Sequence, residues 1–480
     1  MSNAITFGTD GWRDLIAEGF TFPNVRIVAA AIADYVKGAY PGDRPVLVGY
    51  DTRFLAREFA ETVMAVMQDM GLQTILSDRD VPTPVIAFAA RERKTAGAVM
   101  LTASHNPPGY CGIKYIPDYA GPATKDITDQ IVANVRRRQA SSEPLPTRRV
   151  SEPGFDPMPS YLAWIRGLVN AEPIRKAKLK VVYDALYSTG RGYLDALLSE
   201  FGCEVTLLHG QRDPLFGGGM PEPAVSQLGE LIATVKAQGA ALGLATDGDS
   251  DRFGVVDTEG RFYTPNQVIA LLLRHLVKNR GAKGSVVRTV ATTHLIDRLA
   301  QHYGVLVHET PVGFKWVGEK MRQEAVIIGG EESGGLSILG HIPEKDGILA
   351  NLLVVEMVAV EGKPLKQIWA DLVAEVGWDP SNRRLDLHLT QAAKDAVLEH
   401  FVERTPDAIG GQSVTHVGRA DGVKLTLADG SWILVRPSGT EPIIRVYLEA
   451  ASPSELDRLA AAVNETVERV AGGPALTPAH

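Results

Sequence analysis

Short apolar runs that end abruptly in polar loops are the feature that most restricts the fold of this chain. Each loop is followed by a segment with the apolar spacing of a helix, such as 190–201 and 294–303. Continuous apolar runs are typical of strands buried on both faces, and their alternation with helices indicates α/β units. Three such units in series predict a threefold repetition of one α/β module. The runs are Val46–Tyr50 before Asp51-Thr52-Arg53, Leu179–Tyr183 before Asp184-Ala185, and Ser285–Val290 before Ala291-Thr292-Thr293.

The last part of the chain has a different pattern. An Asp429-Gly430 turn joins two strand-like segments, 423–427 and 431–436, and Asp-Gly between such segments is a strong hairpin signal. A third strand is predicted over 443–449 and a helix over 453–470. The C-terminal unit is therefore expected to be α+β.

With 480 residues the chain is too long for one hydrophobic core. A polar, proline-containing stretch over 136–159 predicts a linker between domains. A turn at Glu259-Gly260 predicts a second domain boundary, and the segment 378–382 predicts a third. We therefore predict domains over 1–150, 151–258, 259–375 and 376–480.

Composition excludes several classes of protein. No apolar stretch is long enough to span a bilayer, and no basic region followed by an apolar one near the start suggests a secretory signal. Cys111 and Cys203 lie far apart without metal-ligand spacing, which fits a reducing cytoplasm. Because the net charge is -8, we expect no nucleic-acid partner, and an anionic ligand must be bound by a local basic pocket.

A serine occupies a polar turn directly after an apolar run. Ser104 lies in Thr102-Ala103-Ser104-His105-Asn106-Pro107-Pro108, where small neighbours leave room for a phosphoryl group. Taken alone, this pattern fits an ordinary turn or a helix N-cap equally well.

Three aspartates alternate in one loop after the apolar run 240–245. Asp247, Asp249 and Asp251 would diverge on a helix, but in a curled loop they can converge on one point, where a hard divalent cation offsets their repulsion. A calcium EF-hand loop is excluded, because Arg252 and Thr258 occupy the positions of its glycine and glutamate. A phosphatase with an aspartate nucleophile, and acids that merely face water, remain as alternatives.

Two further loops suit a phosphorylated sugar. In Gly329-Gly330-Glu331-Glu332-Ser333-Gly334-Gly335, glycines permit close backbone approach, and Glu331 and Ser333 could hold sugar hydroxyls; a flexible acidic turn is the alternative. The segment Arg436-Pro437-Ser438-Gly439-Thr440-Glu441-Pro442 combines an arginine fork, hydroxyls and glycine-turn amides, a donor set for a phosphate dianion that a plain surface turn would not need.

In order and spacing, these four loops resemble the signature loops of the α-D-phosphohexomutase superfamily, and Phe7–Arg13 is similar to its first conserved segment. The resemblance implies three related α/β domains with mixed sheets plus a C-terminal α+β domain, heart-shaped around a central cleft. It also implies that Ser104 carries a phosphoryl group as phosphoserine. By the same likeness, one Mg²⁺ is held by the three aspartates together with the phosphate on Ser104. Glu331 and Ser333 are expected to bind the sugar. The phosphate that does not react is expected to be bound by Arg436, Ser438, Gly439 and Thr440.

Within the superfamily, Gly313-Phe314-Lys315-Trp316 and Glu344-Lys345-Asp346-Gly347 resemble the phosphoglucomutase branch. Pro437 argues against a phosphoglucosamine mutase, because these enzymes usually have alanine at this position. Gly335 weakens the assignment to the mannose-type members, many of which have histidine there. Cys111 departs from the family's usual asparagine. We therefore predict the interconversion of glucose 1-phosphate and glucose 6-phosphate through glucose 1,6-bisphosphate, with a phosphomannomutase or dual-specificity mutase as the alternative and a metal-dependent phosphatase as a distant one.

Phosphoryl transfer depends mainly on positioning and charge neutralisation. Arg13, Lys114 and Lys345 are expected near the transferred phosphate, and one of them, or His105, is expected to manage the hydroxyl proton. Arg252 and Lys315 are expected to bind substrate. The expected partner is a small sugar phosphate, with no membrane and no nucleic acid, and the expected state is a monomer or weak homodimer.

Overall fold

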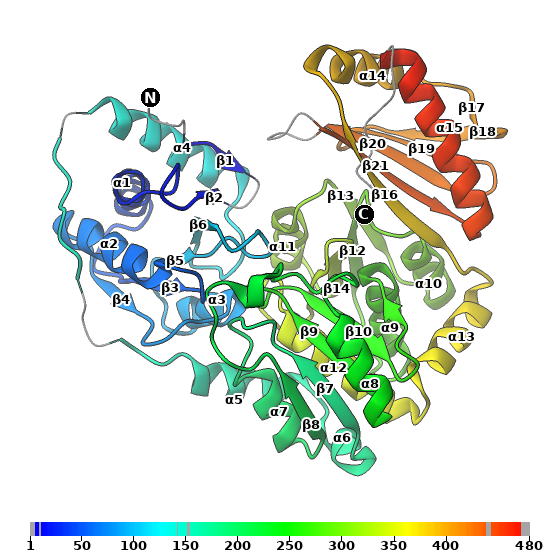
Figure 1. Ribbon diagram of the computed structural model, residues 1–480, viewed down its shortest axis with the longest axis horizontal. Helices are drawn as coiled ribbons and strands as arrows, with labels where there is room; N and C mark the ends of the chain where they lie inside the picture. The colour runs from blue at the N-terminus through cyan, green and yellow to red at the C-terminus, as the bar shows by residue number, and fades with distance from the viewer. Residues whose placement is uncertain (1–4, 9–10, 142, 151–153, 438–442, 472–480) are drawn as a thin grey trace. The chain divides into compact units, whose positions relative to one another are not determined.

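The computed structural model describes residues 5–8, 11–141, 143–150, 154–437 and 443–471 (Figure 1). The chain divides into two compact units. The first comprises Met1–Ser285 and Gly313–Trp369, and the second comprises Val286–Val312 and Ala370–His480.

The first sheet of the first unit is mixed and has the order β1-β2-β6-β5-β3-β4. Strand β3 pairs in parallel with β4 and β5, and the remaining neighbours are antiparallel. Helices α1, α2 and α4 cover one face and α3 the other (Figure 1). The elements are β1 (Phe7–Gly8), β2 (Gly11–Leu15), α1 (Phe22–Ala39), β3 (Val46–Tyr50), α2 (Ala56–Asp69), β4 (Thr74–Leu76), α3 (Thr83–Glu92), β5 (Ala98–Leu101), β6 (Tyr110–Ile116) and α4 (Lys125–Ala140).

The second sheet repeats this arrangement. Its order is β11-β10-β9-β7-β8, with β7 parallel to β8 and β9, and β9 antiparallel to β10. Thus β8-β7-β9-β10 corresponds to β4-β3-β5-β6 of the first sheet. The elements are α5 (Met158–Leu168), α6 (Ala171–Ala177), β7 (Lys180–Asp184), α7 (Leu194–Glu200), β8 (Glu204–Leu208), a 3₁₀ turn (Phe216–Gly218), α8 (Gly229–Gln238), β9 (Leu242–Thr246), β10 (Phe253–Asp257) and β11 (Phe262–Tyr263).

The rest of the first unit is built around a buried helix. Helix α12 (Gly347–Glu361) is buried over most of its length, and Asp346 caps its start by accepting from the Leu349 amide at 2.9 Å. Helix α9 begins with a capping box of Thr264 and Gln267. The other elements are α9 (Pro265–Lys278), α11 (Phe314–Gln323), β14 (Val326–Glu331), antiparallel to β15 (Gly335–Ile338), and the start of α13 (Leu365–Val376).

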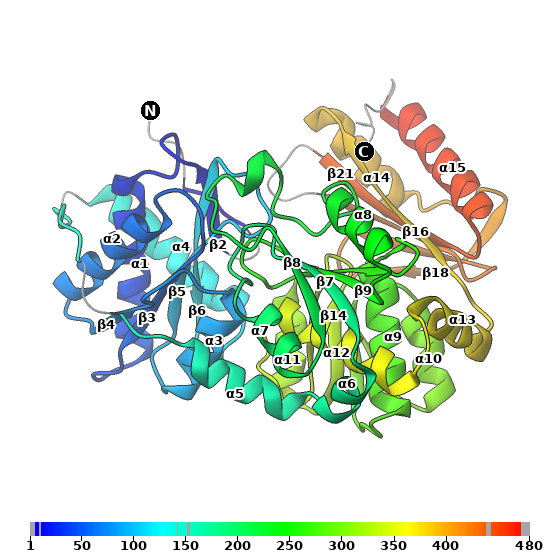
Figure 2. The same cartoon turned by 60° about the horizontal axis from the view of Figure 1, so that its bottom comes forward.

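The second unit contains a parallel strand pair and an antiparallel sheet. The sheet has the order β16-β21-β20-β19-β18-β17, and α14 and α15 pack side by side on it (Figure 2). The elements are β12 (Ser285–Thr289), parallel to β13 (Val307–Thr310), α10 (Leu295–Tyr303), β16 (Ser381–His388), α14 (Gln391–Glu403), β17 (Ala408–Ile409), β18 (Gln412–Gly418), β19 (Val423–Leu427), β20 (Trp432–Pro437), β21 (Ile443–Ala450) and α15 (Pro453–Ala471).

The predicted fold class of α/β units followed by an α+β unit is confirmed. The predicted linker over 136–159 is wrong at its start, because Arg136–Ala140 form the last turn of α4. Cations are favourable at a helix C-terminus, and Arg138 also pairs with Asp34 of α1 at 2.6 Å. Cys111 and Cys203 are free and buried. Among the described helices, none is long and apolar enough to cross a bilayer.

Candidate active site

Ser104 lies directly beyond the end of β5, in a strained backbone conformation. Its φ of +50° is in the left-handed region, which is uncommon for a residue with a side chain. The Ser104 amide donates to Thr102 Oγ1 at 2.8 Å, and its hydroxyl donates to Asp247 Oδ2 at 2.8 Å. Only 1% of the residue is exposed, so the hydroxyl is directed inward at a carboxylate.

The three alternating aspartates occupy the loop between β9 and β10. Asp247, Asp249 and Asp251 are buried, and one carboxylate oxygen of each lies within 4.8 Å of the others. The loop curls because it joins two antiparallel strands and because Ser250 adopts a φ of +59°. The arrangement therefore concentrates negative charge beside Ser104.

Gly248 lets this loop approach the Ser104 loop. A Cβ atom added at Gly248 would lie 2.4 Å from the Ser104 carbonyl oxygen. No side chain fits there, so the two loops pack backbone against backbone.

Burial and neighbouring charges shift the pKa values of two of these aspartates in opposite directions. Burial, together with the charges of Asp251 and Asp249, raises the pKa of Asp247 well above its ordinary value. Burial also acts to raise the pKa of Asp249, but Lys114 and the hydrogen bond from Thr83 outweigh it and lower that pKa. A bound cation would offset the repulsion among these three buried aspartates.

The donor set fits a hard divalent cation. Asp249 Oδ1 and Asp251 Oδ1 are buried and accept no hydrogen bond from any residue in the described part of the chain. Closely spaced carboxylate oxygens with free lone pairs are the ligands that Mg²⁺ prefers, although three are fewer than its usual six. Further oxygens must then come from a phosphate or water.

Two lysines approach the aspartates from different elements. Lys114 on β6 is 3% exposed, and its Nζ lies 3.5 Å from Asp249 Oδ2 and 4.0 Å from Asp251 Oδ2. Lys345, just before α12, has its Nζ 2.7 Å from Asp251 Oδ2. Segments 231 positions apart in the sequence thus place two cations on one acid cluster.

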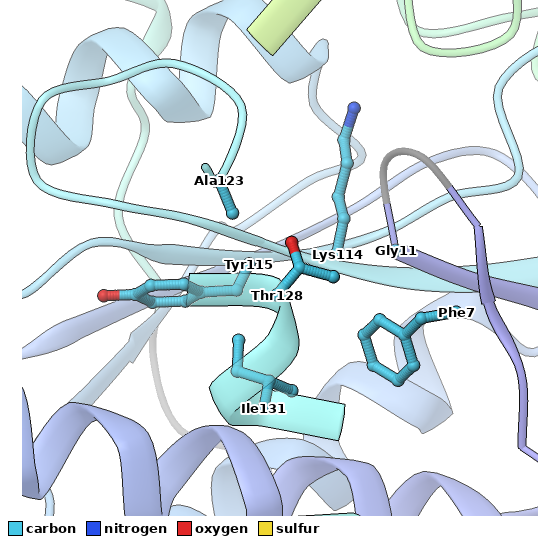
Figure 3. A pocket seen from close by; sticks show the side chains of 7 residues that line it. All are labelled: Phe7, Gly11, Lys114, Tyr115, Ala123, Thr128 and Ile131. Carbon is cyan, nitrogen blue, oxygen red and sulfur yellow. The ribbon is translucent and has the colours of Figure 1, made fainter. Parts of the chain in front are cut away.

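A small pocket lies at the base of the Lys114 side chain (Figure 3). Its lining is mixed, with both apolar and polar side chains, and the Lys114 amino group points away from it. None of the three aspartates lines this pocket, so it is not where the acids gather. It is lined by Phe7, Gly11, Lys114, Tyr115, Ala123, Thr128 and Ile131.

Asp346, the residue after Lys345, is held by a buried network. Asp346 accepts from the Tyr161 hydroxyl at 2.7 Å and pairs with His341 Nε2 at 2.9 Å. Trp164 Nε1 donates to His341 Nδ1 at 3.1 Å. Since indole can only donate, His341 Nδ1 carries no proton and the proton is on Nε2. His341 Nε2 thus donates, and the carboxylate of Asp346 accepts from three donors in all.

Arg13, His105 and Arg252 surround the same cluster. Arg13 Nη1 donates to Asn106 Oδ1 at 2.9 Å, and the Arg252 amide donates to Asp247 Oδ1 at 3.0 Å. His105 Nδ1 lies 3.4 Å from Ser104 Oγ. Burial, and then the charges of Arg252, Arg13 and Lys345, hold the pKa of His105 well below its usual value. The imidazole is therefore neutral, and burial and the nearby cations oppose its protonation.

The glycine-rich loop forms the turn between β14 and β15. Ser333 Oγ donates to Glu331 Oε1 at 2.6 Å, so the two predicted sugar-binding side chains are brought together. A Cβ atom added at Gly335 would lie 2.2 Å from Lys345 Cδ, so this glycine makes room for the lysine stem. Lys315 is the second residue of α11, with its Nζ 5.5 Å from the centre of the neighbouring Trp316 ring.

Arg436 belongs to the second unit, at the end of β20. Its Nε donates to Asp421 Oδ2 at 2.7 Å, and the same oxygen accepts from the Val312 amide at 3.0 Å. The other predicted phosphate ligands, Ser438, Gly439 and Thr440, lie outside the described residues.

Sequence reasoning missed Thr83. Its Oγ1 donates to Asp249 Oδ2 at 2.6 Å, and its amide donates to the Asp249 carbonyl at 2.9 Å. The prolines on either side of Thr83 mark a helix start. A helix-start pattern does not identify Asp249, 166 positions away, as the hydrogen-bond partner of Thr83.

Four family models match the chain in order. Their descriptions are phosphoglucomutase/phosphomannomutase alpha/beta/alpha domain I over residues 4–142, domain II over 159–260, domain III over 264–376, and C-terminal domain over 389–466. The chain is 32% identical over 450 residues to a probable phosphoglucosamine mutase of Methanothermobacter thermautotrophicus, covering 92% of this chain and 93% of the relative. It is 31% identical over 454 residues to a phosphoglucomutase/phosphomannomutase of Thermococcus kodakarensis, covering 93% and 94%.

A solved structure extends this likeness. The crystal structure of a putative phosphomannomutase from Thermus thermophilus matches with a TM-score of 0.86 and 33% identity, covering 98% of this chain and 100% of that one. The repeated α/β modules, the α+β unit and the loop cluster define an enzyme of the phosphohexomutase class. The chain belongs to the phosphoglucomutase/phosphomannomutase family of the α-D-phosphohexomutase superfamily, so the resemblance predicted from its loops is confirmed.

Proposed function

We propose that the protein interconverts glucose 1-phosphate and glucose 6-phosphate, with Ser104 as the phosphoryl carrier. The observation that carries this proposal is the 2.8 Å hydrogen bond from Ser104 Oγ to Asp247, inside a buried cluster of three acids and two lysines. A serine that is 1% exposed is shielded from water, which favours transfer to a sugar hydroxyl over hydrolysis.

The proposed reaction has two symmetrical halves. In the first, a free sugar hydroxyl attacks the phosphorus of phosphoserine, its bond to Ser104 Oγ breaks, and the hydroxyl proton passes to a neighbouring base. The product is glucose 1,6-bisphosphate. After this intermediate turns end for end, Ser104 Oγ attacks the other phosphorus, and the opposite sugar oxygen leaves with a proton. Atoms and charge balance over the cycle, with no net release of phosphate.

Each side chain of the cluster has a proposed part in this chemistry. Asp247, Asp249 and Asp251 would hold Mg²⁺, together with an oxygen of the phosphate on Ser104. Bound there, the ion would neutralise charge on the transferring group. Lys114, Lys345 and Arg13 would neutralise more of that charge. One of these three, or His105, whose Nδ1 lies 3.4 Å from Ser104 Oγ, would take the hydroxyl proton.

Recognition of the sugar is proposed to rest on other loops. Glu331 and Ser333, already linked at 2.6 Å, would bind adjacent sugar hydroxyls, with Arg252 and Lys315 beside the substrate. Arg436, with Ser438, Gly439 and Thr440, would bind the phosphate that is not reacting.

Glucose is proposed as the sugar because Gly313–Trp316 and Glu344–Gly347 are of the phosphoglucomutase type, and because Gly335 replaces the histidine of mannose-type members. Glucosamine phosphate is a second candidate, because a relative that matches over 92% of this chain is a probable phosphoglucosamine mutase. Pro437 favours glucose over glucosamine.

The test is an assay of purified protein with Mg²⁺ and catalytic glucose 1,6-bisphosphate on the 1-phosphates of glucose, mannose and glucosamine. We expect the highest kcat/KM for glucose 1-phosphate and a mass increase of one phosphoryl group at Ser104. Faster turnover of glucosamine 1-phosphate or mannose 1-phosphate would replace the substrate proposed here. Stoichiometric release of inorganic phosphate would replace the mutase by a phosphatase.

A further inference from the structure

Arg53 is a fully buried arginine beneath the Ser104 loop, and it has no part in the mechanism proposed above. It follows β3 in the Asp51-Thr52-Arg53 loop and is 0% exposed. Burying an arginine requires that its charge and its donors are satisfied. The hydrogen-bond acceptors around the Arg53 guanidinium therefore indicate its role.

All five guanidinium N–H groups of Arg53 have an acceptor. Nε donates to Asp51 Oδ2 at 3.1 Å, and the other four bonds go to backbone carbonyls. Nη1 reaches the carbonyls of Pro107 and Tyr110 at 2.7 and 3.0 Å, and Nη2 reaches those of Ser104 and Asn106, both at 2.6 Å. One side chain thus fixes four carbonyls within the segment 104–110.

This segment needs an external support. Ser104 holds a φ of +50°, which a residue with a Cβ atom adopts only when its surroundings impose it. Its carbonyl oxygen is bound by Arg53 and also lies where a Cβ at Gly248 would collide with it. The guanidinium therefore sets the peptide plane from which the Ser104 hydroxyl reaches Asp247.

Arg53 is itself held rigidly. Its amide donates to Asp51 Oδ1 at 2.9 Å while its side chain binds the other carboxylate oxygen. The Phe216 ring covers the guanidinium, with the ring centre 5.0 Å from Cζ. A lysine could not replace this support, because an ammonium has three donors and no planar fork.

We propose that Arg53 is the positioning residue of the phosphoryl carrier: its planar fork holds the 104–110 backbone so that Ser104 Oγ faces the aspartate cluster. The proposal rests on the proposed function of Ser104. It assigns Arg53 no contact with the reacting atoms, so its removal should slow phosphoryl transfer without weakening the binding of sugar phosphate.

The experiment compares Arg53→Lys and Arg53→Ala with the wild type. Because a misplacement of about 1 Å can cost about 100-fold in rate, we expect kcat to fall about 100-fold while KM changes by less than about threefold. Phosphorylation of Ser104 by glucose 1,6-bisphosphate, followed by intact mass, should slow by the same factor. Millimolar guanidinium, but not equal sodium chloride, should restore part of the rate of Arg53→Ala.

Two further measurements separate positioning from general stability. Arg274→Lys changes another buried arginine, one that pairs with Glu361 at 2.8 Å, and should leave Ser104 phosphorylation unchanged. Amide hydrogen exchange should accelerate across 104–110 in the Arg53 variants but not in Arg274→Lys. Should neither variant fold, Asp51→Asn, which removes the charge that anchors Nε, should accelerate the same exchange.

Unchanged exchange in 104–110, or a kcat loss equal to the loss of folded protein, would overturn the assignment of Arg53. Amide hydrogen exchange can be measured on inactive protein, so it tests Arg53 independently of the proposed reaction. A wild type that never becomes phosphorylated at Ser104 would instead overturn the proposed function.

Discussion

Ser104 Oγ lies 2.8 Å from Asp247 Oδ2, across 143 positions of sequence. This bond joins the turn after β5 to the turn between β9 and β10. The hydroxyl proposed to carry the phosphoryl group therefore already contacts the acids proposed to hold the metal.

Ser104→Ala tests the carrier directly. We expect isomerisation to fall by at least about 1000-fold, because the acceptor of the phosphoryl group is gone. The assay is glucose 6-phosphate formation with glucose 1,6-bisphosphate present. Ser160→Ala on α5 is the matched control, because its hydroxyl donates to the Pro157 carbonyl of the preceding turn at 3.3 Å. Full activity in Ser104→Ala would exclude a phosphoserine route.

Thr83→Val removes the donor that orients Asp249. Loss of a partner that orients a metal ligand commonly costs about 10–100-fold in metal affinity, and we expect Mg²⁺ binding to weaken within that range. Calorimetric titration of unphosphorylated protein with Mg²⁺ measures this without turnover. Thr62→Val is the control, since that hydroxyl donates to the Glu58 carbonyl of its own helix at 2.9 Å. Equal affinities in the Thr83 and Thr62 variants would contradict the arrangement.

Gly335→Ala tests the packing of Lys345. The new methyl group would lie 2.2 Å from the lysine Cδ, too close for both atoms to stay in place, and should displace the Nζ from Asp251. We expect kcat to drop by about 10–100-fold, because a misplaced charge stabilises the transition state less well. Gly167→Ala on α5 adds its methyl group where no atom lies within 4 Å and should be neutral. An unchanged kcat for Gly335→Ala would contradict the expected effect of displacing the Lys345 amino group.

Lys424 makes the stability of the second unit depend on pH. Burial, and then the charge of Arg288, lower the pKa of Lys424 to about 8, although Glu309 lies 2.9 Å from its Nζ. Above pH 8 the folded state loses this proton while the unfolded state keeps it up to about pH 10.4, so stability rises with pH in that window. Relative to Lys424→Met, the wild type should gain up to about 3 kcal/mol between pH 8 and 10.5.

This gain is measured by urea unfolding, followed through fluorotryptophan at Trp432, whose ring centre lies 4.5 Å from the Lys424 Nζ. The control is Lys176→Met, because the Lys176 side chain is 75% exposed and should add no dependence on pH in this range. A pH-independent difference between the wild type and Lys424→Met would show that the lysine keeps its proton when folded.

The strands were predictable because their signal is local. Strands β3 and β19 cover the same residues as the predicted 46–50 and 423–427, since an apolar run between polar loops defines both ends of a buried strand. Helix α7 begins at Leu194 instead of 190, because glycines and a polar turn precede it. The predicted boundaries near residues 150, 258 and 375 stay predictions.

The candidate site was predictable only in part. Ser104 and the three aspartates were found because each motif is compact and chemically unusual. Thr83 and Arg53 were not given a role, because their partners are 166 and 51 positions away and are carboxylate or backbone oxygens. A side chain that binds the backbone of another loop leaves no pattern in its own segment.

By itself, the sequence determined the order of strands and helices, the loops that carry reactive groups, and the family. These depend on the periodicity of apolar residues and on the chemistry of short segments. Only the tertiary structure decided that Lys114 and Lys345 meet the same aspartates, that Gly248 presses against the Ser104 carbonyl, and that Arg53 supports the serine from below. Such contacts depend on how sheets place distant loops, and that placement is a property of the packed chain as a whole.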